Sequence, residues 1–441
     1  MREQRPRRML ALEYMAHWRR ILYVSFVAQT LSLIGFSFVF PFLPLYIQTL
    51  GVRGRAVPVW SGVLGFGLSI SMALVAPVWG TLADRYGRKP MVVRAMAGGV
   101  VTTGLLIVAP NVWVVLLLRI LQGILAGSVA ASQALVAAVT PREEMAFSMG
   151  LMQSAVFSGA AVGPFIGGFL NDRLGFHGTF AAGAGMLLVA TLLVVFFVDE
   201  RFERPAGAGS ARINPYANMR SLAASAGLLA MALVLFMAEF GNVVPAPVLP
   251  LFVSHLSGVP RMEGQPQTST AVGVILAVAG VCAALSSWRV QRLSDRFGYR
   301  RVLIAATALA GALYVPAFFV QSVWQLVAVR ASVGFCLGAA MPTASAMVGL
   351  LTPERRRASA YSLMASATSL GIAVGPLVGG ALGALYGLRP VFLVTASVLI
   401  LVALAVATTV REPAVEPAAE AVGAVSRPAP QRLTSGARGR K

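Results

Sequence analysis

The stretch GTLADRYGRKP occupies residues 80–90 and places four charged residues among eleven. They are Asp84, Arg85, Arg88 and Lys89, whereas only 12% of the 441-residue chain is charged. The residues on either side are almost entirely apolar. A short charged turn between two long apolar segments is typical of a chain that crosses a membrane several times.

The composition extends this interpretation to the whole chain. It is 57% hydrophobic, with a mean hydropathy of +0.76, whereas soluble domains average about 45–50% apolar and about 25% charged residues. The alternation typical of membrane β-strands does not occur, so we expect an all-α integral membrane protein rather than a barrel. Runs of about 20 apolar residues predict twelve spans, at roughly 21–44, 60–82, 91–109, 112–139, 145–170, 179–198, 222–250, 270–290, 302–320, 323–350, 358–383 and 390–410.

Basic residues lie mostly on one side of these spans. Of the 36 lysines and arginines, 29 lie in or beside the segments on the side of the N-terminus, five lie in the opposite loops and two inside spans. Because positively charged loops remain in the cytoplasm, we expect both termini there. The net charge of +20 then faces anionic lipid headgroups, and no soluble basic domain is left to bind nucleic acid.

Two polar segments divide the chain. Residues 199–221 form a long interruption between spans 6 and 7, and residues 411–441 are rich in Ala, Pro and Arg without periodicity. Residues 8–20 could lie as an amphipathic helix on the membrane or extend the first span. The predicted organisation is a cytoplasmic N-terminal segment (1–17), a six-helix bundle (18–198), a cytoplasmic linker (199–221), a second six-helix bundle (222–410) and a disordered cytoplasmic tail (411–441).

The two halves repeat each other. PFLPLYIQTLG at 41–51 matches PVLPLFVSHLSG at 247–258, and DRYGRK at 84–89 matches DRFGYR at 295–300. Arg119 and Gly123 recur 211 residues later, and GAAVGPFIGG at 159–168 recurs as GIAVGPLVGG, 212 residues later. Each half has six spans, so the repeats are parallel and related by an axis along the membrane normal. This arrangement predicts a transporter with a substrate site between the halves.

The acidic residues suggest an energy source. Of the 16 Asp and Glu residues, Glu239 is the one well inside a predicted span. A carboxyl group removed from water can bind and release a proton near neutral pH, so Glu239 is a candidate for the proton site or for a cationic substrate. Alternatively, a protonated Glu239 only bonds a neighbouring helix. The chain has two lysines, neither followed by Ser or Thr, so it has no phosphate-binding P-loop of its own.

Arg119 and Arg330 occupy matching places inside spans, and an arginine cannot lose its charge. Gln122 lies one turn from Arg119 in the stretch RILQG, whereas Arg330 is followed by Val333. A fixed positive charge can expel a proton from a nearby site, so these residues are candidates for proton coupling. The alternative is an arginine that bonds backbone carbonyls. The two cysteines are too few for a metal site, and no metal is expected.

The repeated Gly-Pro stretches predict close helix packing and a bend. Small residues spaced four apart allow helices to approach each other, and proline removes a backbone hydrogen bond. A bend held against a partner helix could close one side of the transport path, whereas the alternative is ordinary small-residue packing. The residues concerned are Gly159, Gly163, Pro164, Gly167, Gly168, Gly375 and Pro376.

These motifs resemble the major facilitator superfamily and, within it, twelve-span drug:proton antiporters of the bacterial multidrug-efflux type. The resemblance covers about residues 18–410 and rests on GTLADRYGRKP, RILQG at 119–123 and the Gly-Pro stretches. It implies a bacterial inner-membrane protein in which the loop motif latches the cytoplasmic side, with Asp84 near the start of span 11. The implied gate residues are Gly80, Asp84, Arg85, Gly87, Arg88 and Lys89, with Asp295 and Arg296 in the second copy.

The sequence also departs from that pattern. Many such exporters carry an acid in span 1, where this chain offers Gln29, and this moves the expected coupling role towards Glu239. The second loop motif is degraded, with Gln291 in place of the first glycine and Tyr299 after Gly298.

The leading hypothesis is export of hydrophobic, drug-like compounds, cationic ones among them, in exchange for protons by alternating access. We expect a monomer surrounded by lipid, with no cofactor and the proton gradient as its energy source. An importer or symporter of sugars or organic acids, and a flippase for lipid-like substrates, remain open alternatives of the same fold. An integral-membrane enzyme is disfavoured because the sequence shows neither HExxH nor clustered Cys and His.

Overall fold

The computed structural model describes residues 4–141, 144–200, 226–259, 261–262, 265–352 and 357–410. Most of the predicted linker 199–221 and all of the tail 411–441 lie outside these residues. The helices and strands are α1 (Gln4–Ser37), η1 (Phe40–Phe42), α2 (Leu43–Thr49), α3 (Ala56–Tyr86), α4 (Arg88–Leu105), η2 (Leu106–Val108), α5 (Val112–Leu125), α6 (Ser128–Val139), α7 (Met145–Phe197), α9 (Ala226–Val243), α10 (Leu249–Val253), β1 (Arg261–Met262), β2 (Gln265–Pro266), α11 (Thr268–Phe297), α12 (Tyr299–Phe319), α13 (Val323–Leu351), α14 (Arg357–Tyr386) and α15 (Pro390–Thr409).

The all-α membrane fold is confirmed. Ten helices of the described chain are long and apolar enough to cross a membrane. One of them, Phe147–Phe197, contains the predicted spans 5 and 6, which meet at Gly175 in a left-handed conformation (φ 68°). The shorter apolar helix Leu229–Val243 lies in predicted span 7, so all twelve predicted spans have a helical counterpart.

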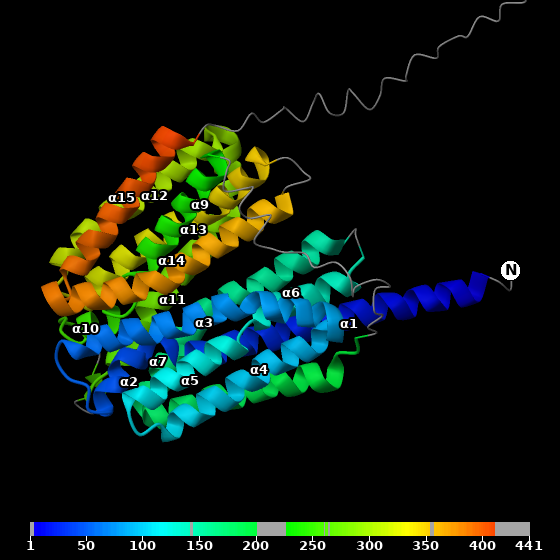
Figure 1. Ribbon diagram of the computed structural model, residues 1–441, viewed down its shortest axis with the longest axis horizontal. Helices are drawn as coiled ribbons and strands as arrows, with labels where there is room; N and C mark the ends of the chain where they lie inside the picture. Colours follow the sequence, from blue (N-terminus) through cyan, green and yellow to red (C-terminus); the bar gives the residue numbers. More distant parts are fainter. Residues whose placement is uncertain are drawn as a thin grey trace, which may run out of the picture.

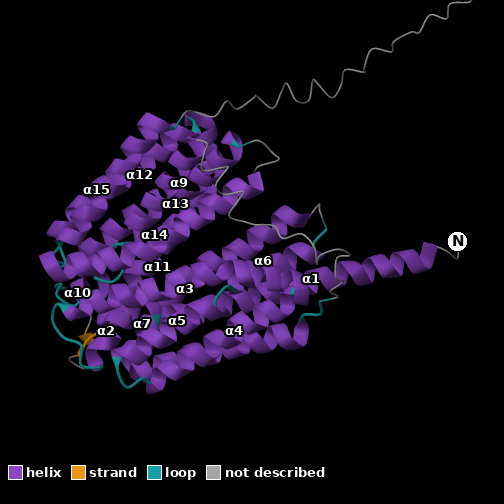
Figure 2. Cartoon of the chain, in the orientation of Figure 1, coloured by secondary structure: helices purple, strands orange, loops and turns teal. Residues whose placement is uncertain are grey.

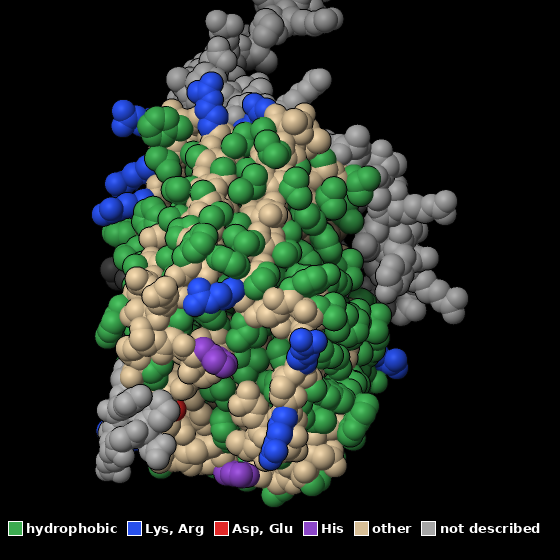
Figure 3. All heavy atoms as spheres, turned by 90° about the vertical axis from the view of Figure 1, so that its left-hand side faces the viewer, with side chains coloured by type: hydrophobic (Ala, Val, Ile, Leu, Met, Phe, Trp, Pro, Cys, Tyr) green, Lys and Arg blue, Asp and Glu red, His purple; other side chains and the backbone are tan. Residues whose placement is uncertain are grey.

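The helices form two bundles, α1–α7 and α9–α15, that meet at one end (Figure 1). The bundles touch where α2 and α10 lie, and they diverge towards the end where α3 turns into α4. We call these the joined end and the divergent end. The strands β1 and β2, which pair antiparallel, also lie at the joined end (Figure 2). Hydrophobic and neutral side chains cover most of the joined end, with single Lys or Arg side chains between them (Figure 3).

Two features differ from the sequence-based expectation. Helix α1 runs without a break from Gln4 to Ser37, so residues 8–20 extend the first span rather than forming a separate helix. The predicted span 112–139 is interrupted between α5 and α6, where Ala126 is extended and Gly127 is left-handed (φ 115°).

Candidate functional site

The repeated Gly-Pro stretches form the contact between the two halves. A Cβ atom added to Gly62 of α3 would overlap the Pro376 carbonyl oxygen of α14, and one added to Gly273 of α11 would overlap the Pro164 carbonyl oxygen of α7. Gly62 and Gly273 are 211 residues apart, and the two prolines are 212 apart. The joined end is therefore built from two equivalent helix crossings that require glycine.

The neighbouring glycines strengthen these two crossings. A Cβ atom on Gly168 would overlap the Ser269 carbonyl oxygen, and one on Gly380 would overlap that of Pro58. The other glycines of the Gly-Pro stretches pack against helices of their own half. Gly159, Gly163 and Gly167 face Leu33, Ser37 and Phe38 of the first bundle, and Gly375 faces Val243 of the second. The bend expected at Pro164 is not a break, because α7 stays helical there and departs from helical geometry at Gly175.

One of the crossings carries a hydrogen-bonded latch that the sequence analysis missed. Both carboxylate oxygens of Asp172 on α7 accept bonds from the first backbone N–H groups of α11, at Ser269 (3.2 Å) and Thr270 (2.7 Å). Asn171 donates to the Ser269 hydroxyl (2.7 Å). A carboxylate at a helix N-terminus is favoured by both the unpaired N–H groups and the helix dipole. The one sequence feature that could have predicted this latch is the position of Asp172 directly after GPFIGGFLN.

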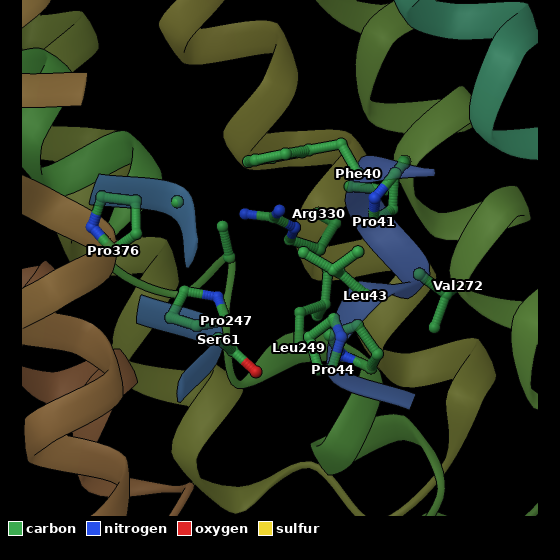
Figure 4. A pocket seen from close by; sticks show the side chains of 14 residues that line it. Phe40, Pro41, Leu43, Pro44, Ser61, Pro247, Leu249, Val272, Arg330 and Pro376 are labelled. Carbon is green, nitrogen blue, oxygen red and sulfur yellow. The ribbon is translucent and has the colours of Figure 1, made fainter. Parts of the chain in front are cut away.

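A cavity of about 90 Å³ lies between the halves beneath this contact (Figure 4). Its wall is mostly apolar, and Arg330 is its one charged lining residue. Drug-sized ligands need about 300–1,000 Å³, so this cavity is too small to be a complete binding site for such a ligand. The lining residues are Phe40, Pro41, Leu43, Pro44, Ser61, Gly65, Ala246, Pro247, Leu249, Pro250, Val272, Leu276, Arg330 and Pro376.

Arg119 and Gln122 of α5 meet in the interior of the first half. The Arg119 guanidinium donates to the side-chain amide oxygen of Gln122 (2.5 Å), and the amide nitrogen of Gln122 donates to the Thr103 hydroxyl of α4 (3.5 Å). Arg119 is 2% exposed and lies 5.4 Å from the ring of Phe40, which lines the cavity. Its Nε and Nη2 atoms have no hydrogen-bond partner among the described residues. The arginine is therefore buried with donors to spare, as expected for a group that acts on something else.

Arg330 occupies the same place in the second half but is held differently. Its guanidinium donates to the Tyr314 hydroxyl (2.6 Å), and its side chain points among the prolines of the cavity (Figure 4). Tyr314 is the counterpart of Thr103, 211 residues later, and Val333 replaces Gln122. The second half therefore replaces a three-residue polar chain by one arginine–tyrosine pair.

Gln29 is completely buried in α1, and neither polar atom of its side-chain amide has a partner in the described part of the chain. Ser25 and Ser32, one turn away on the same face, are also buried with unpaired hydroxyl groups. Buried polar groups are normally bonded, by water if not by protein. This face of α1 therefore favours a hydrated polar strip inside the first half.

The interruption of span 4 follows directly after the Arg119 motif. The Trp79 indole donates to the Ile124 carbonyl oxygen (2.7 Å), and Arg94 donates to that of Ala126 (3.0 Å). The Arg94 guanidinium also stacks on the Trp79 ring at 3.5 Å. A broken membrane helix leaves carbonyl groups without their helical partners, and these two side chains satisfy them. The apolar sequence around Gly127 gave no sign of this break.

Glu239 lies in the last turns of α9, four residues before its end, and is partly buried; its carboxyl group bonds the side chain of Asn242. The Cβ atom of Glu239 faces Gly371 of α14, just as the Cβ atom of Leu33 faces Gly159 in the first half. Glu239 does not line the cavity at the joined end. The structure therefore does not bring it into contact with Arg119 or Arg330.

The loop motif at the divergent end is held within its own half. The backbone N–H groups of Arg88 and Lys89 donate to the Glu200 carboxylate (2.9 and 2.7 Å), and the Lys89 ammonium donates to the Val195 carbonyl oxygen (2.9 Å). Gly87 makes the turn in a left-handed conformation (φ 96°). Glu200 is a further residue that the sequence analysis missed, because it lies 111 residues from the turn that it caps.

The other predicted gate residues make few contacts in this state. Arg85 is exposed beside Tyr86, and a Cβ atom on Gly80 would meet nothing within 4 Å. The side chain of Asp84 lies outside the described part of the structure, so its contact with span 11 stays a prediction.

The second copy of the loop motif keeps only part of the arrangement. Asp295 accepts a hydrogen bond from Tyr299 (3.1 Å), Arg296 lies beside Phe297 and Gly298 is left-handed (φ 88°). Within the described residues, no group of three or more His, Cys, Asp or Glu side chains could hold a metal ion.

Two pseudo-symmetric six-helix bundles, with closely packed glycines at their contact and charged groups inside, define a membrane transporter. The family model described as Major Facilitator Superfamily matches residues 25–292 and 231–438. The chain therefore belongs to the Major Facilitator Superfamily, is a multi-pass membrane protein and is not an enzyme.

Curated relatives and solved structures agree with this assignment. The chain is 35% identical to "Multidrug resistance protein MdtG" from Citrobacter koseri and to the protein of that name from Dickeya zeae, over 87% of this chain and 93% of each relative. The nucleoside transporter NupG has a similar fold (TM-score 0.71, 15% identity, 88% of this chain and 98% of that one). So does a bacterial homologue of the human lysosomal transporter Spinster, solved inward-facing and occupied (TM-score 0.70, 15% identity, 90% and 97%).

Proposed function

We propose that this transporter exports hydrophobic, drug-like compounds, cationic ones among them, in exchange for protons. The observation that carries the proposal is the 35% identity, over nearly the full length, to two proteins named for multidrug resistance. The apolar, proline-rich wall between the halves supports the substrate class, because pockets for hydrophobic compounds are mostly apolar with a few polar groups.

Proton coupling is assigned to residues inside the two halves. Glu239 lies inside the apolar helix α9, and an ionisable group within a membrane-spanning segment normally serves transport. Arg119 supplies a fixed positive charge with unused donors, and Gln122 and Gln29 supply neutral polar groups. In this assignment Glu239 binds the proton or the cationic group of the substrate, and Arg119 favours release of the proton.

The two ends of the molecule support alternating access. The halves meet at the joined end through the Gly-Pro crossings and the Asp172 latch. If the joined end faces outwards, as the distribution of basic residues indicates, the structure is open to the cytoplasm. Closure of the divergent end around Gly80 and Asp84 would then accompany opening of the joined end.

Transport by everted membrane vesicles tests the proposal. Vesicles from a pump-deficient bacterial host that produces the full chain should accumulate ethidium, a lipophilic cation, when their interior is acidified. Collapse of the pH gradient with nigericin should abolish accumulation. Accumulation that does not respond to nigericin would contradict proton exchange. Nigericin-sensitive loss of ethidium from preloaded everted vesicles, without accumulation, would indicate an importer.

A further inference from the structure

A groove on the second half combines four arginines with an apolar wall. Helices α11 and α12 both pack on α13 but separate from each other beyond their turn, and this leaves a groove of about 800 Å³ over α13. Arg289, Arg292 and Arg296 line it from α11, and Arg301 lines it from the start of α12. All four side chains are exposed. The groove lies apart from the cavity between the halves and shares no lining residue with it.

The apolar part of the groove extends into the membrane. Apolar residues of all three helices form its walls and floor, among them Val290, Phe297, Ala305, Leu309, Phe335 and Ala339. Its lining residues on α11 run from Ser286 to Phe297, eleven residues apart, a distance of about 16 Å at about 1.5 Å per residue. The hydrocarbon core of a bilayer is about 30 Å thick, so about 15 Å spans one leaflet. The groove therefore has the depth of one layer of acyl chains.

The repeat shows that this groove is specific to the second half. Val290 and Ala305, which line it, correspond to Trp79 and Arg94 of the first half, 211 residues earlier. There the large side chains stack on each other and bond the carbonyl groups of the interrupted span. Small residues and an unbroken α13 leave the equivalent place empty of side chains in the second half.

The charge of the groove selects its occupant. Among the described residues none of the four arginines forms an ion pair, and the nearby Asp295 does not line the groove but accepts a bond from Tyr299. Guanidinium groups match the oxygen atoms of phosphate in bidentate geometry. An amphiphile with an anionic phosphate head and hydrocarbon tails would satisfy both ends of the groove.

We propose that this groove binds a phospholipid with a net negative headgroup from the leaflet beside the α11–α12 turn. The arginines hold the phosphate, and the acyl chains lie along α12 and cover the floor formed by α13. A bound lipid would fasten α11, which crosses to the first half, to α12 and α13.

Native mass spectrometry of the full-length protein in detergent tests this site. We expect phosphatidylglycerol to bind at least about tenfold more tightly than phosphatidylcholine, because basic residues attract an anionic lipid more strongly than a zwitterionic one. Replacing the four arginines by glutamine should remove this preference. The separate substitution Ala305→Trp, at an exposed position that keeps all four charges, should weaken binding of phosphatidylglycerol by filling the groove.

A matched variant separates the groove from general positive charge. Arg19, Arg20, Arg53 and Arg55 are also exposed, and their replacement by glutamine should leave the preference unchanged. Equal losses in the two fourfold variants, or unchanged binding in Ala305→Trp, would overturn the proposal. Glycerol phosphate should compete for the groove less effectively than phosphatidylglycerol. Equally effective competition would overturn the proposal, because the site would then bind phosphate without binding acyl chains.

Discussion

The two halves share one plan but differ at the positions that carry charge. In the first half, Arg119 is bonded to Gln122 and keeps unused donors; in the second, Arg330 is paired with Tyr314. Glu239 of α9 occupies the position in the second half that Leu33 of α1 occupies in the first, and each faces the first glycine of the Gly-Pro stretch in its own half. The two halves therefore share their packing positions. They differ in their polar groups: the arginine with unused donors lies in the first half, and the acid Glu239 lies in the second.

The fourth helix of each half shows the same contrast. In the first half it is interrupted at Gly127, where Trp79 and Arg94 bond the freed carbonyl groups. In the second half α13 continues through Gly338, the counterpart of Gly127, and Ser287 of α11 donates to the Gly338 carbonyl oxygen (2.9 Å). The interruption thus requires particular side chains on neighbouring helices, and it lies directly after the Arg119 motif.

The largest difference between the halves should appear in the transport rates of variants that lack Arg119 or Arg330. We expect Arg119→Leu to lower proton-driven transport by about tenfold or more, because it removes a buried positive charge that has unused donors. Arg330→Leu should cost less, because that guanidinium is already held by Tyr314. Initial rates of ethidium uptake in vesicles, corrected for protein amount, measure both. Equal losses would contradict the division of roles.

The shared crossings should respond equally. Gly62→Ala and Gly273→Ala each place a methyl group on a proline carbonyl oxygen of the opposite half, so either should separate the halves at the joined end. Spin labels at the exposed and equivalent positions Val108 and Phe319, in a protein with Cys282 and Cys336 replaced by alanine, would report a longer distance. Gly185→Ala, whose added methyl group meets no atom within 4 Å, is the control. An effect of one substitution without the other would show that the crossings are not equivalent.

The Asp172 latch should have a smaller effect than the crossings. Asp172→Asn removes a charge from the N-terminus of α11, an interaction worth about 1 kcal/mol, and should increase the fraction open at the joined end by about fivefold. The same spin-label pair measures this fraction, and Asp199→Asn, at an exposed residue outside the crossing, serves as the control. A distance distribution unchanged by Asp172→Asn would show that the Asp172 latch does not help to close the joined end.

The last contrast between the halves concerns stability rather than transport, and it is expected at the interrupted helix. Trp79→Phe removes the donor to the Ile124 carbonyl oxygen and should lower the free energy of unfolding by about 1–3 kcal/mol. Val290→Phe changes the equivalent position of the second half, where no such bond exists. Thermal unfolding in detergent should show a lower midpoint for Trp79→Phe than for Val290→Phe. The opposite order would mean that the indole bond does not stabilise the break.

Much of the fold could be predicted from local pattern. The apolar runs and the repeated motifs at Asp84 and Asp295 are signals within a few residues of the features that they predict. Contacts between distant segments could not be predicted in this way: Asp172 bonds Ser269, 97 residues later, and Glu200 bonds Lys89, 111 residues earlier. The interruption at Gly127 lies in an uninterrupted apolar run, and its cause lies on two other helices.

The most direct test of the account is proton release by purified protein in proteoliposomes. We predict that the native protein releases protons when ethidium is added, and that Glu239→Gln, inserted in equal amount, does not. Glu144→Gln, which changes a carboxyl group outside the spans, should behave as the native protein does. Unaltered release by Glu239→Gln would contradict the assignment of the proton site to the second half.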